Sequence, residues 1–336
     1  MNYLYAINFV PGFEDLVGQL LKGLDAEAVL SEEAFCIVKL KEKLKPRDYV
    51  KFNFAKNVVQ LLEWSGKDGQ LNLNFDVDPN DFELGGYSTF NLRNFESAKP
   101  TKMDSSIRDH LTSEISKKFN LEYRSFNPDV DFVLAKRRGG VSYFGVKLKL
   151  REKISLQKGE LDPDVANLLL ELGGIKNADY MLDAFAGNGG ISKEALRSFG
   201  AGTNRGSHNL NVILVEKSSR LVNRLKVELD KKLARVIAGD VVKFLNKTDK
   251  VFDLVVADPP WGDFEDYPGG LEALEKLYLD FLEAAKGKIS KDGIITIMSS
   301  KKEVLERAAE CSGLKLEASL NILVSGNKVL VLKLRD

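Results

Sequence analysis

The stretch Met181-Leu182-Asp183-Ala184-Phe185-Ala186-Gly187-Asn188-Gly189-Gly190 indicates how the second half of the chain folds. A short apolar run ends in an acid and passes into a glycine-rich loop, which is typical of a buried parallel strand at its carboxyl end. A second stretch, Val255-Val256-Ala257-Asp258-Pro259-Pro260-Trp261-Gly262, has the same apolar run ending in an acid. Ligands of open α/β sheets bind outside the carboxyl ends of the strands, so we expect two neighbouring sites there.

Strands and helices alternate from residue 178 onward. We expect strands at about 180–183, 211–216, 235–239, 252–257, 293–298, 316–323 and 328–334. This alternation predicts a mostly parallel seven-stranded sheet covered by helices on both faces, an α/β Rossmann-like fold over residues 160–336. Only Gly326-Asn327 separates the last two strands, which predicts an antiparallel hairpin at the sheet edge.

The first half of the chain predicts two smaller α+β units. Residues 1–66 have the order β-α-β-β-α-β of a ferredoxin-like unit, with helices over about residues 13–24 and from Pro46 to about Lys56. Polar residues 66–80 then mark a boundary. Within a second unit, residues 67–155, we expect a strand at 89–95, a helix capped by Asp104, and a hairpin of strands 130–135 and 141–150.

Length and composition set the broad class. The 336 residues, with no formal net charge, predict a folded protein of two or three domains. No apolar run is long enough to span a membrane and the N-terminus does not resemble a secretory signal, so we expect a cytoplasmic protein without membrane contact. Cys36 and Cys311 are too few for a disulfide framework or a zinc site, so we expect no metal. We also expect a monomer.

Acids at three successive strand ends outline a nucleoside site. Glu216 can accept both hydroxyls of a ribose, and Asp240 could meet the amine of an adenine. Asp183 would repel the pyrophosphate of a dinucleotide but attract the cationic methionyl portion of S-adenosylmethionine. We therefore predict S-adenosylmethionine as cofactor, held by Asp183, Phe185, Gly187, Asn188, Gly189, Glu216, Lys217, Asp240, Val241 and Asp258. The structural alternative is a glycine-rich loop that only makes a tight turn.

The second stretch predicts a site for a planar amine. The Asp258 carboxylate and the Pro259 carbonyl can accept hydrogen bonds from one exocyclic NH2 group, and Trp261 can stack on a base. Such a site directs the nitrogen at the sulfonium methyl and acts by positioning and electrostatics. We predict that the catalytic residues are Asp258, Pro259, Pro260 and Trp261. The alternative is a proline-rich loop with a packed tryptophan.

The two motifs also resemble a known family. The run Asp-Ala-Phe-Ala-Gly-Asn-Gly-Gly with Asp-Pro-Pro-Trp resembles class I S-adenosylmethionine-dependent methyltransferases of exocyclic amino nitrogens, and Pro-Pro-Trp-Gly is similar to the form in cap trimethylguanosine synthases. Residues 126–132 and 141–148 look like the end of a THUMP domain. Nearly the whole chain thus resembles THUMP-containing tRNA and rRNA guanine-N2 methyltransferases.

The resemblance implies an RNA methyltransferase that modifies guanine N2, with tRNA as the expected substrate. An adenine-N6 or protein-amide methyltransferase stays open, since the motif accepts any planar amine, and so does an RNA-binding protein without activity. Because alternate residues of a strand share a face, basic residues at the hairpin and after it could contact phosphates. We predict RNA contacts for Lys136, Arg137, Arg138, Lys147, Lys149 and Arg151, with Lys153 on the same face. The alternative is a solvated strand face.

Overall fold

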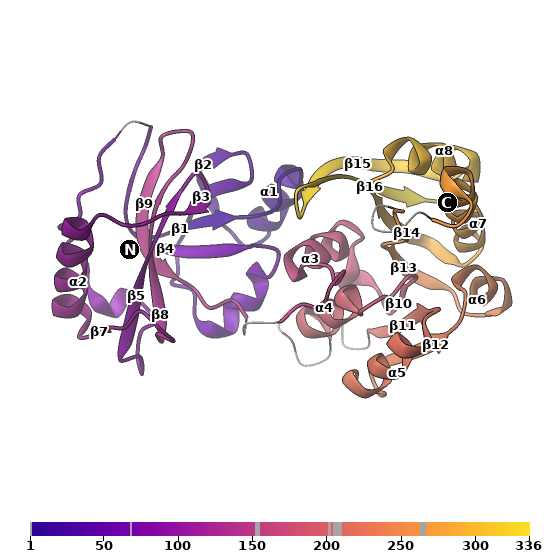
Figure 1. The fold of residues 1–336 in the computed structure, drawn as a ribbon, viewed down its shortest axis with the longest axis horizontal. Helices are drawn as coiled ribbons and strands as arrows, with labels where there is room; N and C mark the ends of the chain where they lie inside the picture. The colour runs from indigo at the N-terminus through magenta and orange to yellow at the C-terminus, as the bar shows by residue number, and fades with distance from the viewer. Residues whose placement is uncertain (1, 68, 152–154, 201–202, 204–209, 263–266) are drawn as a thin grey trace. The chain divides into compact units, whose positions relative to one another are not determined.

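A computed structural model of the protein describes residues 2–67, 69–151, 155–200, 203, 210–262 and 267–336. The chain divides into two compact units (Figure 1). The N-terminal unit comprises Met1–Phe9 and Val17–Glu152, and the C-terminal unit comprises Val10–Leu16 and Lys153–Asp336. None of the described helices has both the length and the apolar character needed to cross a membrane.

Residues 1–66 follow the predicted order of elements, with one difference. Its elements are β1 (Tyr3–Asn8), α1 (Glu14–Lys22), β2 (Glu27–Glu32), β3 (Phe35–Leu40), the 3-10 helix η1 (Pro46–Phe52) and β4 (Asn57–Ser65). The predicted second helix is therefore a short 3-10 helix. Phe52 and Phe54 are both buried, with ring centroids 5.9 Å apart. Residues two apart do not lie on the same face of an α-helix. Because the side chains of Phe52 and Phe54 are both buried, an α-helix does not continue through them.

The next segment completes the same sheet. Its elements are η2 (Pro79–Asp81), β5 (Thr89–Glu96), β6 (Lys99–Pro100), α2 (Ser105–Phe119), β7 (Glu122–Tyr123), β8 (Val130–Lys136) and β9 (Ser142–Lys147). Asp104 caps α2 as predicted, because its carboxylate accepts from the Ser106 and Ile107 backbone N–H groups at 2.8 and 3.4 Å.

One nine-stranded sheet runs through the N-terminal unit. Its order is β2-β3-β1-β4-β9-β8-β5-β6, and β7 pairs with β5. Strands β4 and β9 pair antiparallel, so the segments before and after residue 66 contribute to one sheet. The boundaries predicted near residues 66 and 155, and the ferredoxin-like and THUMP assignments, stay predictions.

The strand predicted over residues 141–150 is shorter than expected. β9 ends at Lys147, and the Leu150 N–H donates to the Leu148 carbonyl at 3.1 Å in a tight turn. Lys149 and Arg151 therefore lie beyond the strand, and the prediction of one basic strand face is wrong. Lys153 lies outside the described residues.

The C-terminal unit has all seven predicted strands. Its elements are α3 (Pro163–Leu172), η3 (Ile175–Asn177), β10 (Tyr180–Asp183), α4 (Gly190–Phe199), β11 (Asn211–Glu216), α5 (Ser219–Glu228), β12 (Ala234–Ala238), α6 (Val241–Lys247), β13 (Phe252–Ala257), α7 (Gly270–Lys286), β14 (Ile289–Ser299), α8 (Lys302–Ser312), β15 (Lys315–Val324) and β16 (Asn327–Arg335). The sheet is mixed: five neighbouring strands are parallel, and β16 is antiparallel to both β14 and β15, which confirms the edge hairpin. Its two-residue turn is Ser325-Gly326, one residue earlier than predicted, because Asn327 pairs with Val324 as the first residue of β16.

The strand order places the two sequence motifs side by side. The order is β12-β11-β10-β13-β14-β16-β15, with α3, α4 and α5 on one face and α6, α7 and α8 on the other (Figure 1). Chain order reverses between β10 and β13, which is where ligands of such sheets bind. Asp183 ends β10 opposite Val256 of β13, two residues before Asp258. The fold therefore brings the glycine-rich loop and the Asp-Pro-Pro-Trp stretch to one edge of the sheet.

Candidate functional site

Asp183 lies fully buried at the carboxyl end of β10. One of its oxygens, Oδ2, accepts from the Ser192 backbone N–H at 3.2 Å and from the Ser192 hydroxyl at 2.7 Å. The other oxygen, Oδ1, has no hydrogen-bond partner among the described residues. Burial raises the pKa of Asp183 to about 6, and the nearby Glu216 carboxylate adds to that rise. Because burial disfavours the ionised form of Asp183, a nearby cation would stabilise its carboxylate.

Glu216 ties the glycine-rich loop to the end of the next strand. Its Oε2 accepts from the Gly187 N–H at 2.8 Å, and its Oε1 accepts from the Ser218 N–H at 2.6 Å. Each carboxylate oxygen can accept a second hydrogen bond, so Glu216 can hold the loop and still receive hydroxyl groups. Gly187 and Gly189 have φ angles of +51° and +81°, in the left-handed region that favours glycine.

The Asp258-Pro259-Pro260-Trp261 stretch follows β13 directly. Asp258 keeps part of its surface accessible, yet burial raises its pKa to about 7, and the Asp183 carboxylate adds to that rise. The indole N–H of Trp261 partly opposes the rise, although it makes no well-formed hydrogen bond with any described residue. The Asp183 carboxylate thus acts on the pKa of Asp258, and the Glu216 carboxylate acts on that of Asp183, so three acids lie near one another at this edge of the sheet.

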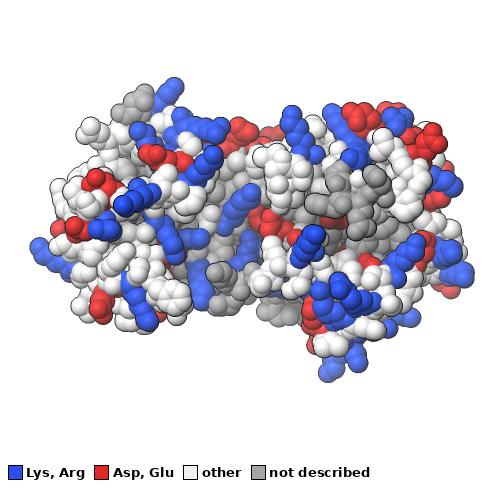
Figure 2. Space-filling view, viewed as in Figure 1, with Lys and Arg blue, Asp and Glu red and all other residues white. Residues whose placement is uncertain are grey.

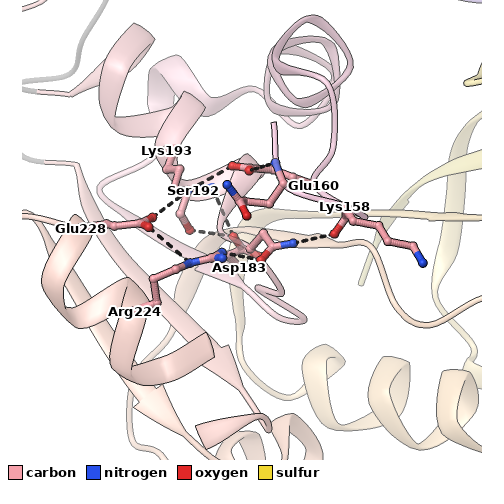
Figure 3. Close-up of polar contacts among 9 residues, drawn as sticks. Lys158, Glu160, Asp183, Ser192, Lys193, Arg224 and Glu228 are labelled. Atoms are coloured by element: carbon pink, nitrogen blue, oxygen red, sulfur yellow. Dashed lines mark hydrogen bonds and ion pairs between the residues drawn. The ribbon is translucent and has the colours of Figure 1, made fainter. Parts of the chain in front are cut away.

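Ion pairs brace the helix that follows the glycine-rich loop (Figure 3). Lys193 of α4 lies 3.0 Å from a Glu160 oxygen and 2.9 Å from a Glu228 oxygen. Arg224 of α5 also contacts Glu228, at 3.3 Å. The Glu160 side chain is only 5% exposed, so its pairing with Lys193 is screened less by water than an ordinary surface ion pair.

The Asn188 side chain joins the same network. Its amide donates to the Lys158 carbonyl at 3.0 Å, and its oxygen accepts from the Arg224 guanidinium. A Cβ on Gly190 would lie 3.1 Å from the Leu161 carbonyl oxygen, so the chain before α3 packs directly on this loop. Because these protein contacts occupy the Asn188 side chain, any ligand contact from this position would come from its backbone.

The remaining predicted cofactor residues occupy different settings. Asp240 caps α6 by accepting from the Lys243 N–H at 3.1 Å, Val241 packs in the hydrophobic core, and Lys217 is exposed. Phe185 packs edge-on against Phe281 of α7, with ring centroids 5.1 Å apart. Asp240 and Phe185 thus have structural roles, and any contact with a ligand would be a second role for them. The Val241 side chain is buried in the core and cannot contact a ligand.

The predicted RNA-binding residues do not form one group. Arg137 donates to Glu32 at 3.0 Å, to Asn8 at 3.2 Å and to the Glu33 carbonyl at 3.0 Å, and lies 3.9 Å above the Phe35 ring. Arg151 donates to the Ala55 carbonyl at 3.1 Å. These contacts hold the N-terminal sheet together. They leave Lys136, Arg138, Lys147 and Lys149 as the exposed members of the predicted set.

Basic and acidic side chains are mixed on the face drawn in Figure 2. Figure 2 shows basic side chains interspersed with acidic ones on the face it draws, which agrees with a formal net charge of zero. A uniformly basic face is absent from that view. Among the described residues, no three His, Cys, Asp or Glu side chains are grouped to hold a metal ion.

Several site residues escaped sequence reasoning. Ser192 orients Asp183, Glu160 pairs with Lys193, and the Tyr278 hydroxyl donates to the Pro260 carbonyl at 2.8 Å. Ser192 had a local signal, since it lies in the first turn of the helix after the glycine-rich loop, where a hydroxyl can reach back to the strand end. Glu160 and Tyr278 had none, because their partners are distant in sequence.

An open α/β sheet with a glycine-rich loop and acids at its switch point defines a nucleoside-binding domain. Residues 151–329, more than half of the chain, match the family described as RMKL-like, methyltransferase domain (UPF0020). The chain belongs to this family, and its C-terminal unit is a methyltransferase domain.

Curated relatives match part of the chain. A tRNA (guanine(10)-N2)-dimethyltransferase from Methanothermobacter thermautotrophicus is 30% identical over 143 residues, 41% of this chain and 38% of the relative. A tRNA (guanine(6)-N2)-methyltransferase from Thermus thermophilus is 28% identical over 177 residues, 51% of this chain and 50% of the relative. The matched segments thus span half or less of the length of these relatives.

A solved structure matches the whole fold. TrmN from Thermus thermophilus superposes with a TM-score of 0.71 over 99% of both chains, at 18% sequence identity. This similarity shows that the order and packing of the elements in both halves of the chain occur together in another protein. At this identity it shows the fold alone.

The residues present fit S-adenosylmethionine. Asp183 offers an unpaired buried oxygen beside two further carboxylates, and Glu216 offers spare acceptor positions next to backbone N–H groups of the loop. A sulfonium cation would relieve the mutual repulsion of the acids, and a ribose would use the acceptors. The same acids would repel the phosphates of a dinucleotide.

Proposed function

We propose that this protein is an S-adenosylmethionine-dependent RNA methyltransferase that methylates the exocyclic N2 of a guanosine in tRNA. The observation that carries the proposal is the placement of Asp258 and the Pro-Pro-Trp stretch beside Asp183, at the switch point of the sheet. The names of the two curated relatives, both guanine-N2 methyltransferases of tRNA, support the choice of acceptor. We further propose that residues 67–155 form a THUMP-like RNA-binding domain and that the protein acts in the cytoplasm as a monomer.

The proposed mechanism uses few groups. The ionised Asp258 carboxylate and the Pro259 carbonyl accept the two amine hydrogens of the guanine, and the Trp261 ring stacks on the base. When bound, S-adenosylmethionine supplies a methyl group activated by its sulfonium charge. Asp183 and Glu216 would hold the sulfonium charge and the ribose of that cofactor, so that the amine nitrogen would face the methyl group. S-adenosylhomocysteine is the leaving group, and the Asp258 carboxylate can accept the proton that the methylated amine loses, so no stronger base is needed.

The test of this function is a comparison of acceptors. Full-length protein with S-adenosylmethionine carrying a labelled methyl is offered unmodified tRNA transcripts, double-stranded DNA or a protein extract freed of nucleic acid. We expect label in tRNA alone. Label in the protein extract alone would favour the protein-amide alternative, and binding of tRNA without any transfer would favour an RNA-binding protein without activity.

The affinity for RNA should depend on exposed lysines of the N-terminal unit. Changing Lys147 and Lys149 together to Glu should weaken binding to all RNAs alike and reduce the slope of log affinity against log salt by about 1 per lost contact. S-adenosylmethionine affinity should not change, since that site lies in the other unit. Filter binding over a series of salt concentrations measures both quantities.

The matched control changes Lys22 and Lys117 to Glu, which alters net charge equally at other exposed or half-exposed positions of the same unit. We expect the control to retain the wild-type salt slope. If both pairs weaken binding equally, net charge alone is responsible and the RNA contacts lie elsewhere.

A further inference from the structure

Helix α7 contacts both loops of the proposed active site. The hydroxyl of Tyr278 lies 2.8 Å from the Pro260 carbonyl oxygen and 2.9 Å from the Ser299 hydroxyl. One turn further, the Phe281 ring packs against Phe185 of the glycine-rich loop. Tyr278 and Phe281 are both fully buried and are three residues apart, so they lie on the same face of the helix.

The hydrogen bonds around Tyr278 can run in only one direction. A carbonyl only accepts, so the Tyr278 hydroxyl donates its single hydrogen to Pro260. The Ser299 hydroxyl must then donate to Tyr278, and it accepts in turn from the Lys301 backbone N–H at 3.0 Å. The result is a continuous chain from Lys301 through Ser299 and Tyr278 to Pro260, in which each bond strengthens the next.

This series of hydrogen bonds supplies the Pro259-Pro260 loop with a hydrogen-bond donor, which the loop itself lacks. Neither Pro259 nor Pro260 has a backbone N–H, so the loop cannot be fixed there by its own donors. Tyr278 fixes the Pro260 carbonyl, and with it the peptide plane that leads into Trp261. The neighbouring Pro259 carbonyl is the oxygen that the proposed mechanism assigns to the amine of the substrate, so a fixed Pro260–Trp261 peptide would also fix the position of that acceptor.

We propose that Tyr278, oriented by Ser299, is a positioning residue that holds the Pro260–Trp261 peptide in the arrangement needed for methyl transfer. Tyr278 does not touch the reacting atoms in this proposal. Its catalytic consequence rests on the proposed function, whereas its effect on the order of Trp261 does not. The two can therefore be measured separately.

Order of the loop is read from tryptophan fluorescence. The chain has two tryptophans, so Trp64→Phe leaves Trp261 as the single reporter. In that background, Tyr278→Phe keeps the buried ring but removes the donor. We expect lower anisotropy for Trp261 and quenching by acrylamide that is about twofold more efficient, because the ring is held less firmly. Unchanged anisotropy and quenching in Tyr278→Phe would overturn the inference.

Catalysis gives the second readout. In Tyr278→Phe, kcat for tRNA should fall about tenfold, the effect of losing one hydrogen bond that positions a reacting group. The dissociation constant of S-adenosylmethionine should stay the same. Adding Ser299→Ala to Tyr278→Phe should cause little further loss, since both residues belong to one chain of hydrogen bonds. Losses that simply multiply would contradict that arrangement.

Tyr5→Phe is the matched control. Tyr5 is also fully buried, and its hydroxyl accepts from the Leu44 backbone N–H at 2.9 Å, but it lies in the N-terminal unit. It should change neither Trp261 fluorescence nor kcat. If Tyr278→Phe fails to fold by circular dichroism, Ser299→Ala alone tests the same chain and should loosen Trp261 in the same direction. A wild-type protein that transfers no methyl to tRNA refutes the proposed function, while the fluorescence still decides the role of Tyr278.

Discussion

Replacing Asp258 by alanine should lower turnover by about 100-fold or more, while S-adenosylmethionine still binds. Asp258 is the charged acceptor that orients the amine, so its loss should lower the rate of the methyl-transfer step. Asp258→Asn keeps the shape and one acceptor oxygen but places a donor beside the amine, so it should be nearly as slow. Single-turnover rates with saturating cofactor measure the step, and calorimetry measures cofactor affinity. Turnover within a fewfold of wild type in both variants would contradict the assigned role.

The same residue should set the pH dependence. Burial raises the pKa of Asp258 to about 7, and only the ionised form carries the charge that holds the amine. Turnover should therefore fall as the pH falls through this region, with an inflection at or below pH 7, because a bound cation favours the ionised carboxylate. Asp258→Asn should lose that inflection.

Stability should respond in the opposite sense. Asp258 binds its proton more tightly in the folded protein than at its ordinary value of 3.8, so ionisation costs stability above about pH 7, and this cost disappears as the pH falls toward 4. At pH 8 the cofactor-free Asp258→Asn variant should therefore melt no lower than the wild type. A large fall in its melting temperature would mean that lost activity reflects misfolding.

Glu216→Ala should weaken S-adenosylmethionine and S-adenosylhomocysteine binding by about 10- to 100-fold. The range corresponds to the roughly 1.5–3 kcal/mol attributed to hydrogen bonds with charged groups. Glu216 also holds the Gly187 N–H at 2.8 Å, so its removal loosens the loop as well. Calorimetry with both ligands gives the affinities, and NAD should not bind to either protein.

Glu228→Ala is the control for this prediction. It removes an acid of the same unit that pairs with Lys193 and Arg224 but does not end a strand. Its effect on cofactor affinity should be several-fold smaller than that of Glu216→Ala. Equal effects would mean that loop bracing, and not acceptance of the ribose, explains the loss; tight NAD binding would refute the cofactor assignment.

The sequence predicts an element best where the residues of that element alone indicate its type and its end. An apolar run that ends in an acid marks both the element and its exposed end, which is why Asp183, Glu216 and Asp258 could be placed at strand ends before the fold was known. The edge hairpin was equally local, since two residues between two apolar runs leave few other conformations.

Contacts between residues far apart in sequence are what the sequence does not indicate. Nothing around Arg137 indicates that Glu32 and Phe35, about a hundred residues away, receive its guanidinium. The end of β9 at Lys147 depends on a turn at Leu148–Leu150, and the shared sheet depends on β4 pairing with β9. A basic pattern alone cannot tell a phosphate contact from an ion pair within the protein.

Nucleoside analysis of methylated tRNA shows whether guanine N2 is the acceptor. Unmodified tRNA transcripts receive a labelled methyl, are digested to nucleosides, and are separated by chromatography with mass detection. We expect label in N2-methylguanosine, and no label once inosine, which lacks the amine, replaces guanosine at the target position. Label in N6-methyladenosine, or label that persists on the inosine-substituted tRNA, would contradict it.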